Sequence, residues 1–212
     1  MKTSIPKSKS LPIISALAIS FCFTIIGLDI NAQDEQSFGT LFGPDTQVNF
    51  VWSPEIKVST IENETGTALG FYAGALINKS FLIAGAFGGS GDYQTNNYCY
   101  FGILGQYTHN PHKLVHPSAQ LLIAAGSTLE YDNERSNIFD NDLETTATFY
   151  FAEPGVNLEV NLSQKIRLVS GLSYRFAWGM DEYSSDYITQ TPLTSNDMSA
   201  FNVNLGLKFG LY

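Results

Sequence analysis

The sequence predicts an all-β protein, an eight-stranded antiparallel up-and-down transmembrane β-barrel. Low charge content, alternating apolar and polar residues, and alternating short turns and long loops all predict this fold. Charged residues make up 15% of the 212 residues, whereas an ordinary soluble domain has roughly 25%. The alternation with a period of two recurs in eight segments, at about residues 49–61, 67–77, 80–88, 98–108, 114–128, 146–162, 165–179 and 198–212.

The segment KIRLVSGLSYRFAW, residues 165–178, shows the alternation most clearly. Every second residue from Ile166 to Trp178 is mostly apolar or aromatic, and the residues between them include Arg167 and Arg175. Successive side chains of a strand point to opposite faces of the sheet. Because a cation that faces lipid at the middle of a bilayer costs roughly 2–4 kcal/mol, both arginines are predicted to point into the barrel.

The segment 146–162 shows a break in the alternation. Phe149 and Phe151 lie out of phase with the apolar residues of 156–162. The change falls at Glu153-Pro154-Gly155, where proline and glycine disturb regular strand pairing, so a β-bulge is expected there.

Short turns and longer polar links alternate between the predicted strands. With an even number of strands, the short turns all fall at one end of the barrel and the longer loops at the other, as in bacterial outer-membrane barrels. The short turns are residues 78–79, 109–113 and 163–164; the link 62–66 is brief, and the long links are 89–97, 129–145 and 180–197.

The N-terminal residues 1–32 read as a secretory signal peptide, with a basic start, an apolar stretch and small residues up to Ala32. The alternative is an uncleaved membrane helix. Residues 33–48 are predicted to be a flexible lead and residues 49–212 the barrel. Removal of three lysines and Asp29 with the signal would change the net charge from −9 to −11, which argues against nucleic acid as a partner.

An eight-stranded barrel has room for its own side chains and little else. The predicted interior therefore holds a polar plug, in which buried charges are paired. Glu159 is expected near Arg167 or Arg175, and the alternative to a plug is the selectivity filter of a narrow pore. The charged residues of this polar network are Lys57, Glu159, Arg167, Arg175 and Lys208, accompanied by Gln106, Gln120, Asn202 and Asn204.

Five stretches of the chain carry a resemblance to a known family. They are PEIKVSTIE, GALINKSFLIAGAFG, KLVHPSAQLLIAAG, EPGVNLEVNLSQKIRLVSGLSYRF and LKFGLY. They resemble the small outer-membrane β-barrel proteins of Gram-negative bacteria, with an OmpA/OmpX-like architecture, over most of residues 49–212. The resemblance implies the fold and an outer-membrane location and brings no catalytic residues. Tyr212 departs from the pattern, because it is out of phase with Phe209 and Leu211.

The candidates for chemistry are few, and no cofactor, metal site or enzymatic activity is predicted. His109, His112 and His116 have a spacing that zinc sites use, but they span a turn and a strand start and are interpreted as part of a solvated turn. No histidine lies near the long loops, which argues against a lipid hydrolase that acts at that end. Cys99 is interpreted as a small packed side chain.

The long loops are acidic, and Asp140, Asp142 and Glu144 could present carboxylates to a divalent cation or contact a surface partner. The sequence lacks the glycine and the later glutamate of an EF-hand loop. A solvated, self-repelling loop is the simpler interpretation.

Together these features predict an integral outer-membrane barrel in contact with outer-membrane lipid, non-enzymatic, with a structural or surface-interaction role. One alternative is transport of small solutes through a narrow, porin-like pore. Another is a soluble, secreted, lipocalin-like barrel that binds an apolar ligand, and such a barrel would have its apolar face inside. The near-absence of lysine and glutamate from most strands favours lipid outside.

Overall fold

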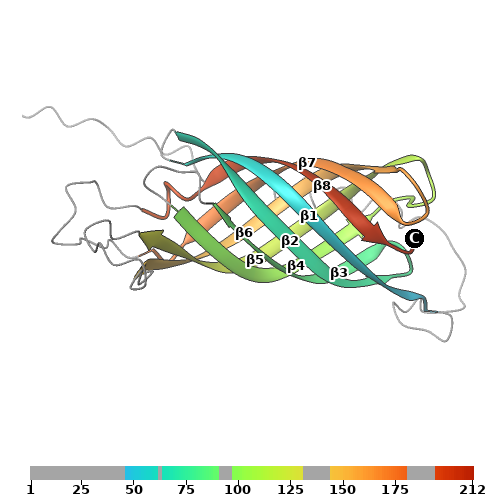
Figure 1. Ribbon diagram of the computed structural model, residues 1–212, viewed down its shortest axis with the longest axis horizontal. Coiled ribbons are helices and arrows are strands. Elements are labelled where there is room, and N and C mark those ends of the chain that lie inside the picture. Colours follow the sequence, from blue (N-terminus) through green and yellow to red (C-terminus); the bar gives the residue numbers. More distant parts are fainter. Residues whose placement is uncertain (1–45, 62–63, 91–96, 131–143, 181–193) are drawn as a thin grey trace, which may run out of the picture. The chain divides into compact units, whose positions relative to one another are not determined.

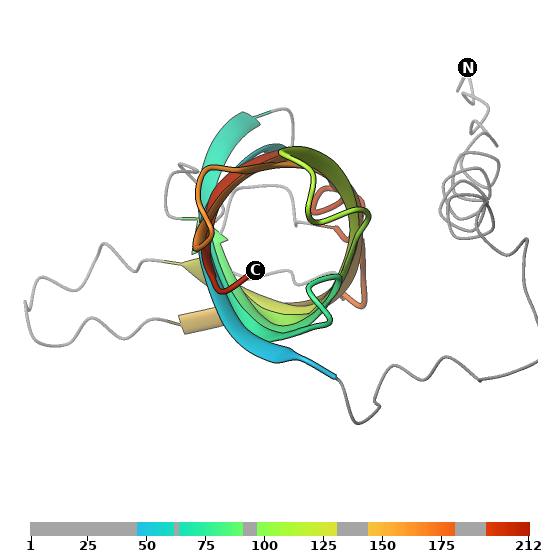
Figure 2. The same cartoon turned by 90° about the vertical axis from the view of Figure 1, so that its right-hand side faces the viewer.

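The computed structural model describes residues 46–61, 64–90, 97–130, 144–180 and 194–212. These residues form one closed barrel in which each strand pairs antiparallel with its neighbour in sequence and β1 pairs with β8 (Figures 1 and 2). The predicted fold class is therefore confirmed. The strands are β1 (Val48–Ile61), β2 (Glu64–Ile77), β3 (Phe81–Ser90), β4 (Asn97–Thr108), β5 (Val115–Glu130), β6 (Glu144–Asn161), β7 (Ile166–Trp178) and β8 (Ala200–Gly210).

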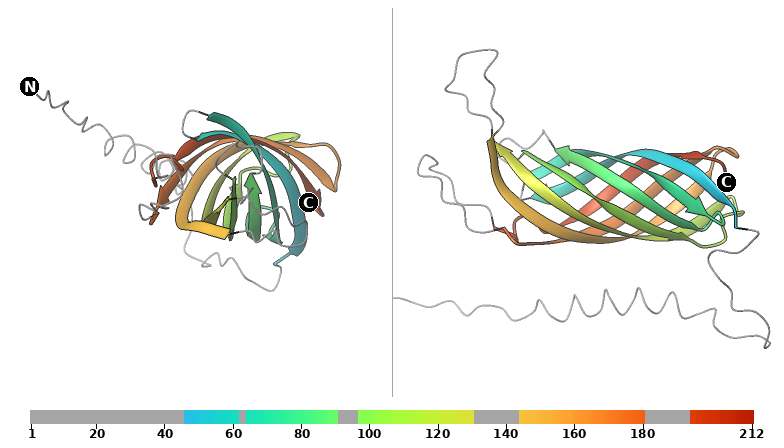
Figure 3. Two further views of the ribbon diagram at one scale, coloured as in Figure 1. Left: turned by 60° about the vertical axis from the view of Figure 1, so that its left-hand side comes forward. Right: turned by 90° about the horizontal axis from the view of Figure 1, so that it is seen from below.

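The predicted segments agree with these strands to within three residues at each end. The third strand, which is the shortest of the predicted segments, has 10 residues in the structure. Strand β6 is the longest, with 18 residues. Such lengths are sufficient for tilted strands to cross a bilayer, and the strands run obliquely to the barrel axis (Figure 3). The predicted signal peptide and most of the predicted lead lie outside the described residues. No helix among the described residues is long and apolar enough to cross a membrane.

The short turns lie together at one end of the barrel, the right-hand end in Figure 1. The β2–β3 turn is closed by a hydrogen bond from the Ser80 amide to the Ile77 carbonyl, and its central residues Asn78 and Lys79 have φ of 51° and 61°. Positive φ at both central positions is the signature of a type I′ hairpin turn. Its twist matches that of the strands, which explains how so short a connection closes the hairpin.

The two faces of the barrel wall differ as the alternation predicts. The outer face is apolar and exposed: Phe101 and Phe201, for example, have 69% and 74% of their surface accessible. Arg167 and Arg175 on β7 point inward and have 1% and 0% accessible. A lipocalin-like barrel has its apolar residues inside, so this geometry is the opposite of the soluble alternative.

The expected β-bulge at residues 153–155 is wrong. The pairing of β6 with β5 continues through these residues without a shift, from Gly155 opposite Gln120 to Glu153 opposite Leu122. The register shift lies elsewhere, between Thr128 and Leu129. Phe149 and Phe151 keep the same phase as Glu153 and point into the barrel.

Phe149 and Phe151 belong to an aromatic part of the interior near the long loops, and both have 0% of their surface accessible. Their rings lie 5.9 Å apart, and the Tyr98 and Tyr100 rings pack against them edge-on. Gly126 lies opposite Phe149 in the β5–β6 pairing, and a Cβ atom on it would come within 2.5 Å of the Phe149 ring. The interior near the loops is therefore apolar. The inward residues of β6 change from aromatic to polar along the strand, while the alternation of inward and outward residues continues unbroken.

Candidate functional site: the charged interior

Strand β6 contributes to every layer of the barrel interior, because its odd-numbered residues from Phe149 to Asn161 face inward. The row begins with aromatic residues near the long loops, continues with a carboxylate, an amide and a second carboxylate, and ends with an amide at the short turns. These inward residues are Phe149, Phe151, Glu153, Gly155, Asn157, Glu159 and Asn161.

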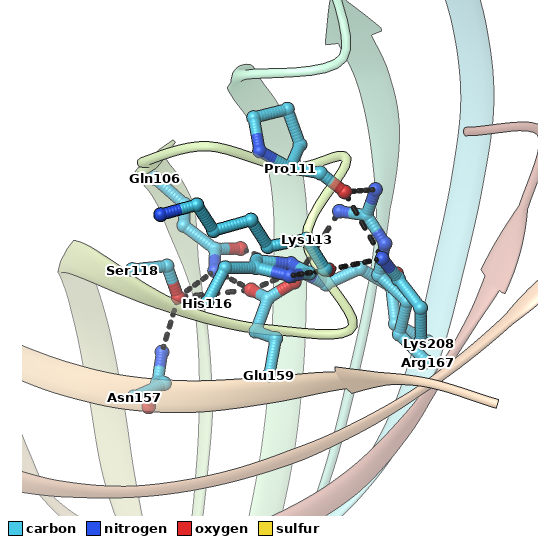
Figure 4. A network of polar contacts seen from close by, with 10 residues as sticks. Gln106, Pro111, Lys113, His116, Ser118, Asn157, Glu159, Arg167 and Lys208 are labelled. Carbon is cyan, nitrogen blue, oxygen red and sulfur yellow. Dashed lines mark hydrogen bonds and ion pairs between the residues drawn. The ribbon is translucent and has the colours of Figure 1, made fainter.

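Glu159 is the centre of the network nearer the short turns (Figure 4). Its Oε1 accepts hydrogen bonds from Lys208 Nζ at 2.7 Å, from Ser118 Oγ at 2.9 Å and from Gln106 Nε2 at 2.5 Å. Lys208 Nζ also donates to Gln106 Oε1 at 2.9 Å. These residues come from β4, β5, β6 and β8, so the network connects strands on different sides of the barrel.

The second oxygen of Glu159 faces two further nitrogens. Arg167 Nη1 donates to Oε2 at 3.4 Å, and His116 Nε2 lies 3.4 Å from the same atom. The other ring nitrogen of His116 bonds the Lys113 carbonyl at 2.9 Å, and Arg167 Nη2 reaches the Pro111 carbonyl at 3.5 Å. The network thus ties the carboxylate to the backbone of the β4–β5 turn.

Glu153 is the centre of a second network, farther from the short turns. Its Oε1 accepts hydrogen bonds from Lys57 Nζ at 2.7 Å and from Ser173 Oγ at 2.9 Å, and its Oε2 accepts one from Arg175 Nε at 3.3 Å. Lys57 Nζ also lies 3.3 Å from Glu55 Oε1. This group holds as many carboxylates as cations, so its formal charges cancel.

Arg175 connects the second network to the aromatic part of the interior. Its Nη2 donates to the Tyr98 hydroxyl at 3.2 Å, and its guanidinium carbon lies 5.0 Å from the Tyr98 ring centroid and 4.9 Å from that of Phe151. A planar guanidinium can bond a carboxylate and lie over aromatic rings at the same time. Arg175 is therefore placed where the charged and the aromatic layers meet.

Amide side chains fill the space between the two networks. Asn157 Nδ2 donates to Gln120 Oε1 at 2.8 Å, and Asn157 Oδ1 accepts from Asn204 Nδ2 at 3.1 Å. At the end of the row, Asn161 Nδ2 donates to the carbonyls of Pro111 and Lys113 at 3.0 and 2.8 Å. Buried polar groups cost free energy unless they are hydrogen-bonded, and this arrangement satisfies most of them.

The structure places all of the predicted lumen charges in the interior, but in two groups rather than one. Arg167 and Lys208 contact Glu159, whereas Arg175 and Lys57 contact Glu153. Glu159 thus lies beside Arg167, one of its two expected neighbours. Glu153 is not among the residues that the sequence predicts for this site, because the expected bulge removed it from the inward row.

His116 corrects the interpretation of the three histidines as a solvated turn. His116 has 1% of its surface accessible and belongs to the Glu159 network, whereas His112 is exposed and His109 half-buried. The alternation along β5 could have identified it, because His116 lies on the same face of the strand as the polar residues Ser118 and Gln120. Among the described residues, no group of three or more His, Cys, Asp or Glu side chains is gathered to hold a metal ion.

Cys99 differs from its expected role, whereas the place of Tyr212 agrees with its being out of phase with the exposed Leu211. Cys99 is exposed on the outer face of β4 rather than packed. Tyr212 lies after β8, and the Arg167 guanidinium carbon is 3.6 Å from the centroid of its ring; the chain end lies within the ring of strands in Figure 2. Burial raises the pKa of the Tyr212 hydroxyl above its usual range, so it remains protonated at neutral pH.

The predicted loop site is not described in full. Asp140 and Asp142 lie outside the described residues, and Glu144 is the first residue of β6, opposite Glu130. The proposal of a cation or partner contact at these carboxylates therefore stays a prediction.

An apolar outer face around an ion-paired interior defines the class of protein: an eight-stranded membrane β-barrel. Known structures share the fold. Neisserial surface protein A is 11% identical to this chain, and the match covers 77% of this chain and 97% of that protein with a TM-score of 0.50. OprG from Pseudomonas aeruginosa (8% identity, 78% and 96% coverage, TM-score 0.42) and Ail from Yersinia pestis (10%, 77% and 97%, 0.41) are more distant in structure.

All three proteins are eight-stranded outer-membrane β-barrels, and the likeness to Neisserial surface protein A shows that this chain has their fold. No family model matches the chain, and a search of curated proteins finds no match to its sequence.

Proposed function

We propose that this chain is an integral outer-membrane barrel with a sealed lumen, that it has no enzymatic activity, and that its role is structural or lies in contacts made by its long loops. The observation that carries the proposal is that apolar side chains cover the outside of the barrel and charged side chains lie inside, the reverse of a soluble protein. Phe201 and its outward neighbours expose apolar surface, while Glu153 and Glu159 are fully buried with their cations. Only a surrounding lipid makes such an outer surface favourable.

The packing of the interior supports a sealed lumen. Lys57, Arg167, Arg175 and Lys208 each have 1% or less of their surface accessible, so neither bulk water nor a passing solute touches them. An open pore would leave such groups hydrated. The aromatic layer around Phe149 adds an apolar barrier at the loop end.

The loops are the part of the chain that would meet a partner. Residues 129–145 contain six acidic residues and one arginine. Such a loop would bind a divalent cation, bridge to lipid phosphates or contact a basic partner surface. In this proposal, Asp140, Asp142 and Glu144 are the first residues to substitute together when loop contacts are measured.

Fractionation and gel mobility test the membrane location. The protein should remain in the washed outer-membrane pellet, and its unboiled form should migrate differently from its boiled form, because a closed barrel stays folded in detergent until heated. Recovery in the soluble fraction without a mobility shift would contradict the proposal.

A narrow pore is the second candidate function, and conductance distinguishes it from a sealed barrel. The sealed barrel predicts no current steps above the bilayer background when the purified protein is inserted into a planar bilayer. Reproducible steps that change size in an Arg175→Met variant would instead assign a conducting path through the Glu153 network.

A further inference from the structure

The short-turn end of the barrel carries exposed lysines. Each short turn has one: Lys79 follows β2, Lys113 follows β4 and Lys165 follows β6. Lys113 and Lys165 are exposed and Lys79 is half-exposed. Within the described part of the chain, none of the three ammonium groups forms an ion pair; the ion pairs there all involve cations of the interior.

Each lysine lies close in the sequence to an exposed apolar residue. Phe81, Leu114 and Leu162 lie one to three residues from Lys79, Lys113 and Lys165, with 37%, 68% and 57% of their surface accessible. A lysine at this border can lay its aliphatic stem along the apolar surface and extend its ammonium group to the level of lipid headgroups. The three turns thus place exposed cations close to exposed apolar residues, which is the arrangement expected where lipid headgroups border the hydrocarbon core.

The backbone at Lys79 shows that the fold does not require a lysine at this position. Lys79 has φ of 61° at a central position of the β2–β3 turn, where glycine has no steric penalty and is preferred. Asn78 is suited to its own positive φ, and its side chain accepts a hydrogen bond from the Gln47 amide at 3.1 Å. No hydrogen bond or ion pair of the Lys79 side chain is found among the described residues, so a glycine could take its place in the turn without the loss of such a contact.

The chain is otherwise acidic, with a net charge of −9. The β5–β6 and β7–β8 connections together contain many carboxylates and a single cation, Arg135. The exposed cations of the described barrel are therefore collected at the short-turn end. Charge complementarity at the headgroup level selects an anionic lipid as the occupant.

We propose that Lys79, Lys113 and Lys165 bind the phosphate headgroups of anionic phospholipids, of the phosphatidylglycerol type, in the leaflet that surrounds the short-turn end. The inference rests on the proposed membrane location. Headgroup binding at three points around the rim fixes the depth of the barrel and holds its short-turn end at the lipid surface.

The two tryptophans of the chain report on the two ends separately. Trp52 is exposed on the outer face near the start of β1, and its ring stacks on Phe209 with centroids 4.4 Å apart. Trp178 is exposed at the last residue of β7, next to the long loops. A Trp178→Phe variant isolates the signal of Trp52, and a Trp52→Phe variant isolates that of Trp178.

The experiment uses the full chain in vesicles of phosphatidylcholine and phosphatidylglycerol, in which the acyl chains of one lipid or the other are brominated. Bromine quenches the fluorescence of a tryptophan that it touches. At Trp52, the relative binding constant should favour phosphatidylglycerol about fivefold for each lipid that engages one lysine, and the preference should fall in 1 M salt. At Trp178 no such preference is expected.

The variant Lys79→Gly, Lys113→Gln, Lys165→Gln should reduce the preference at Trp52 to about one. Lys79→Gly alone should reduce it while leaving the unfolding midpoint unchanged or higher, which separates lipid binding from folding. Equal quenching of Trp52 by both lipids would overturn this inference and leave the membrane location intact. Absence of quenching by either lipid at both tryptophans would instead overturn the proposed function.

Discussion

Glu153 and Glu159 point into the barrel from the same row of β6, and each carboxylate binds its own two cations. Lys57 and Arg175 contact Glu153, and Lys208 and Arg167 contact Glu159. The amide side chain of Asn157 lies between them on the same row. The interior charge is thus divided into two units that can be perturbed separately.

Removal of one carboxylate should destabilise the barrel strongly. Glu159→Gln leaves Arg167 and Lys208 buried without a counter-charge, and breaking a buried pair in this way costs about 3–5 kcal/mol. The expected result is a lower midpoint in urea unfolding from detergent micelles. The double variant Glu159→Gln, Lys208→Met should recover part of the loss, because it removes one of the stranded cations. A midpoint equal to that of the wild type would show that these charges are hydrated rather than buried.

Arg175 should not be replaceable by lysine. Arg175→Lys keeps the charge, but it loses the planar group that bonds both Glu153 and Tyr98 and lies over the Phe151 ring. Arginine and lysine are not equivalent at such sites, so a loss of about 1–3 kcal/mol is expected from the unsatisfied partners. The matched control is Lys113→Arg at an exposed position, which should have no measurable effect. Equal stability of Arg175→Lys and the wild type would remove Arg175 from its bridging role.

The space around Tyr100 depends on glycine. A Cβ atom on Gly88 would lie 2.7 Å from the Tyr100 hydroxyl, whereas a Cβ atom on Gly85 of the same strand would meet nothing within 4 Å. Gly88→Ala should therefore lower the unfolding free energy by about 1–3 kcal/mol through overpacking. Gly85→Ala faces outward and should be neutral. If both variants unfold at the same urea concentration, the aromatic layer is looser than the structure shows.

A charged side chain at the middle of the outer face should destabilise the folded barrel in a bilayer. Leu205 is exposed near the centre of β8, and Leu205→Arg should cost about 2–4 kcal/mol in a bilayer. Leu205→Met retains an apolar surface and should fold as the wild type does. The measurement is the folded fraction after refolding into lipid vesicles, read from gel mobility. Normal folding of Leu205→Arg would place this face away from lipid.

The sequence predicted the wall of the barrel well because alternation is a property of single strands. Arg167 and Arg175 were assigned to the interior from the polarity of their neighbours alone, and Asn202, Asn204 and Lys208 of β8, which are also buried, were assigned in the same way. The period of two requires no knowledge of the other strands.

The prediction failed where the polarity of a side chain no longer indicates whether it points into the barrel or toward the outside. Phe149 and Phe151 are aromatic but point inward, because the interior near the loops is filled by rings from β4 and β6. Reading them as outward produced a bulge that the structure lacks, and this removed Glu153 from the interior. His116 was missed for a related reason: its partner Glu159 is on another strand, and the register that brings them together is a property of the whole sheet.

The central claim is that the apolar face of each strand is outside and meets lipid. A nitroxide label at Leu205→Cys, with Cys22 and Cys99 replaced by serine, tests it most directly in a bilayer. Collisions of the label with oxygen, which dissolves in lipid, should greatly exceed collisions with a water-soluble nickel chelate. More frequent collisions with the nickel chelate would mean that this face is in water, and the membrane barrel would be wrong.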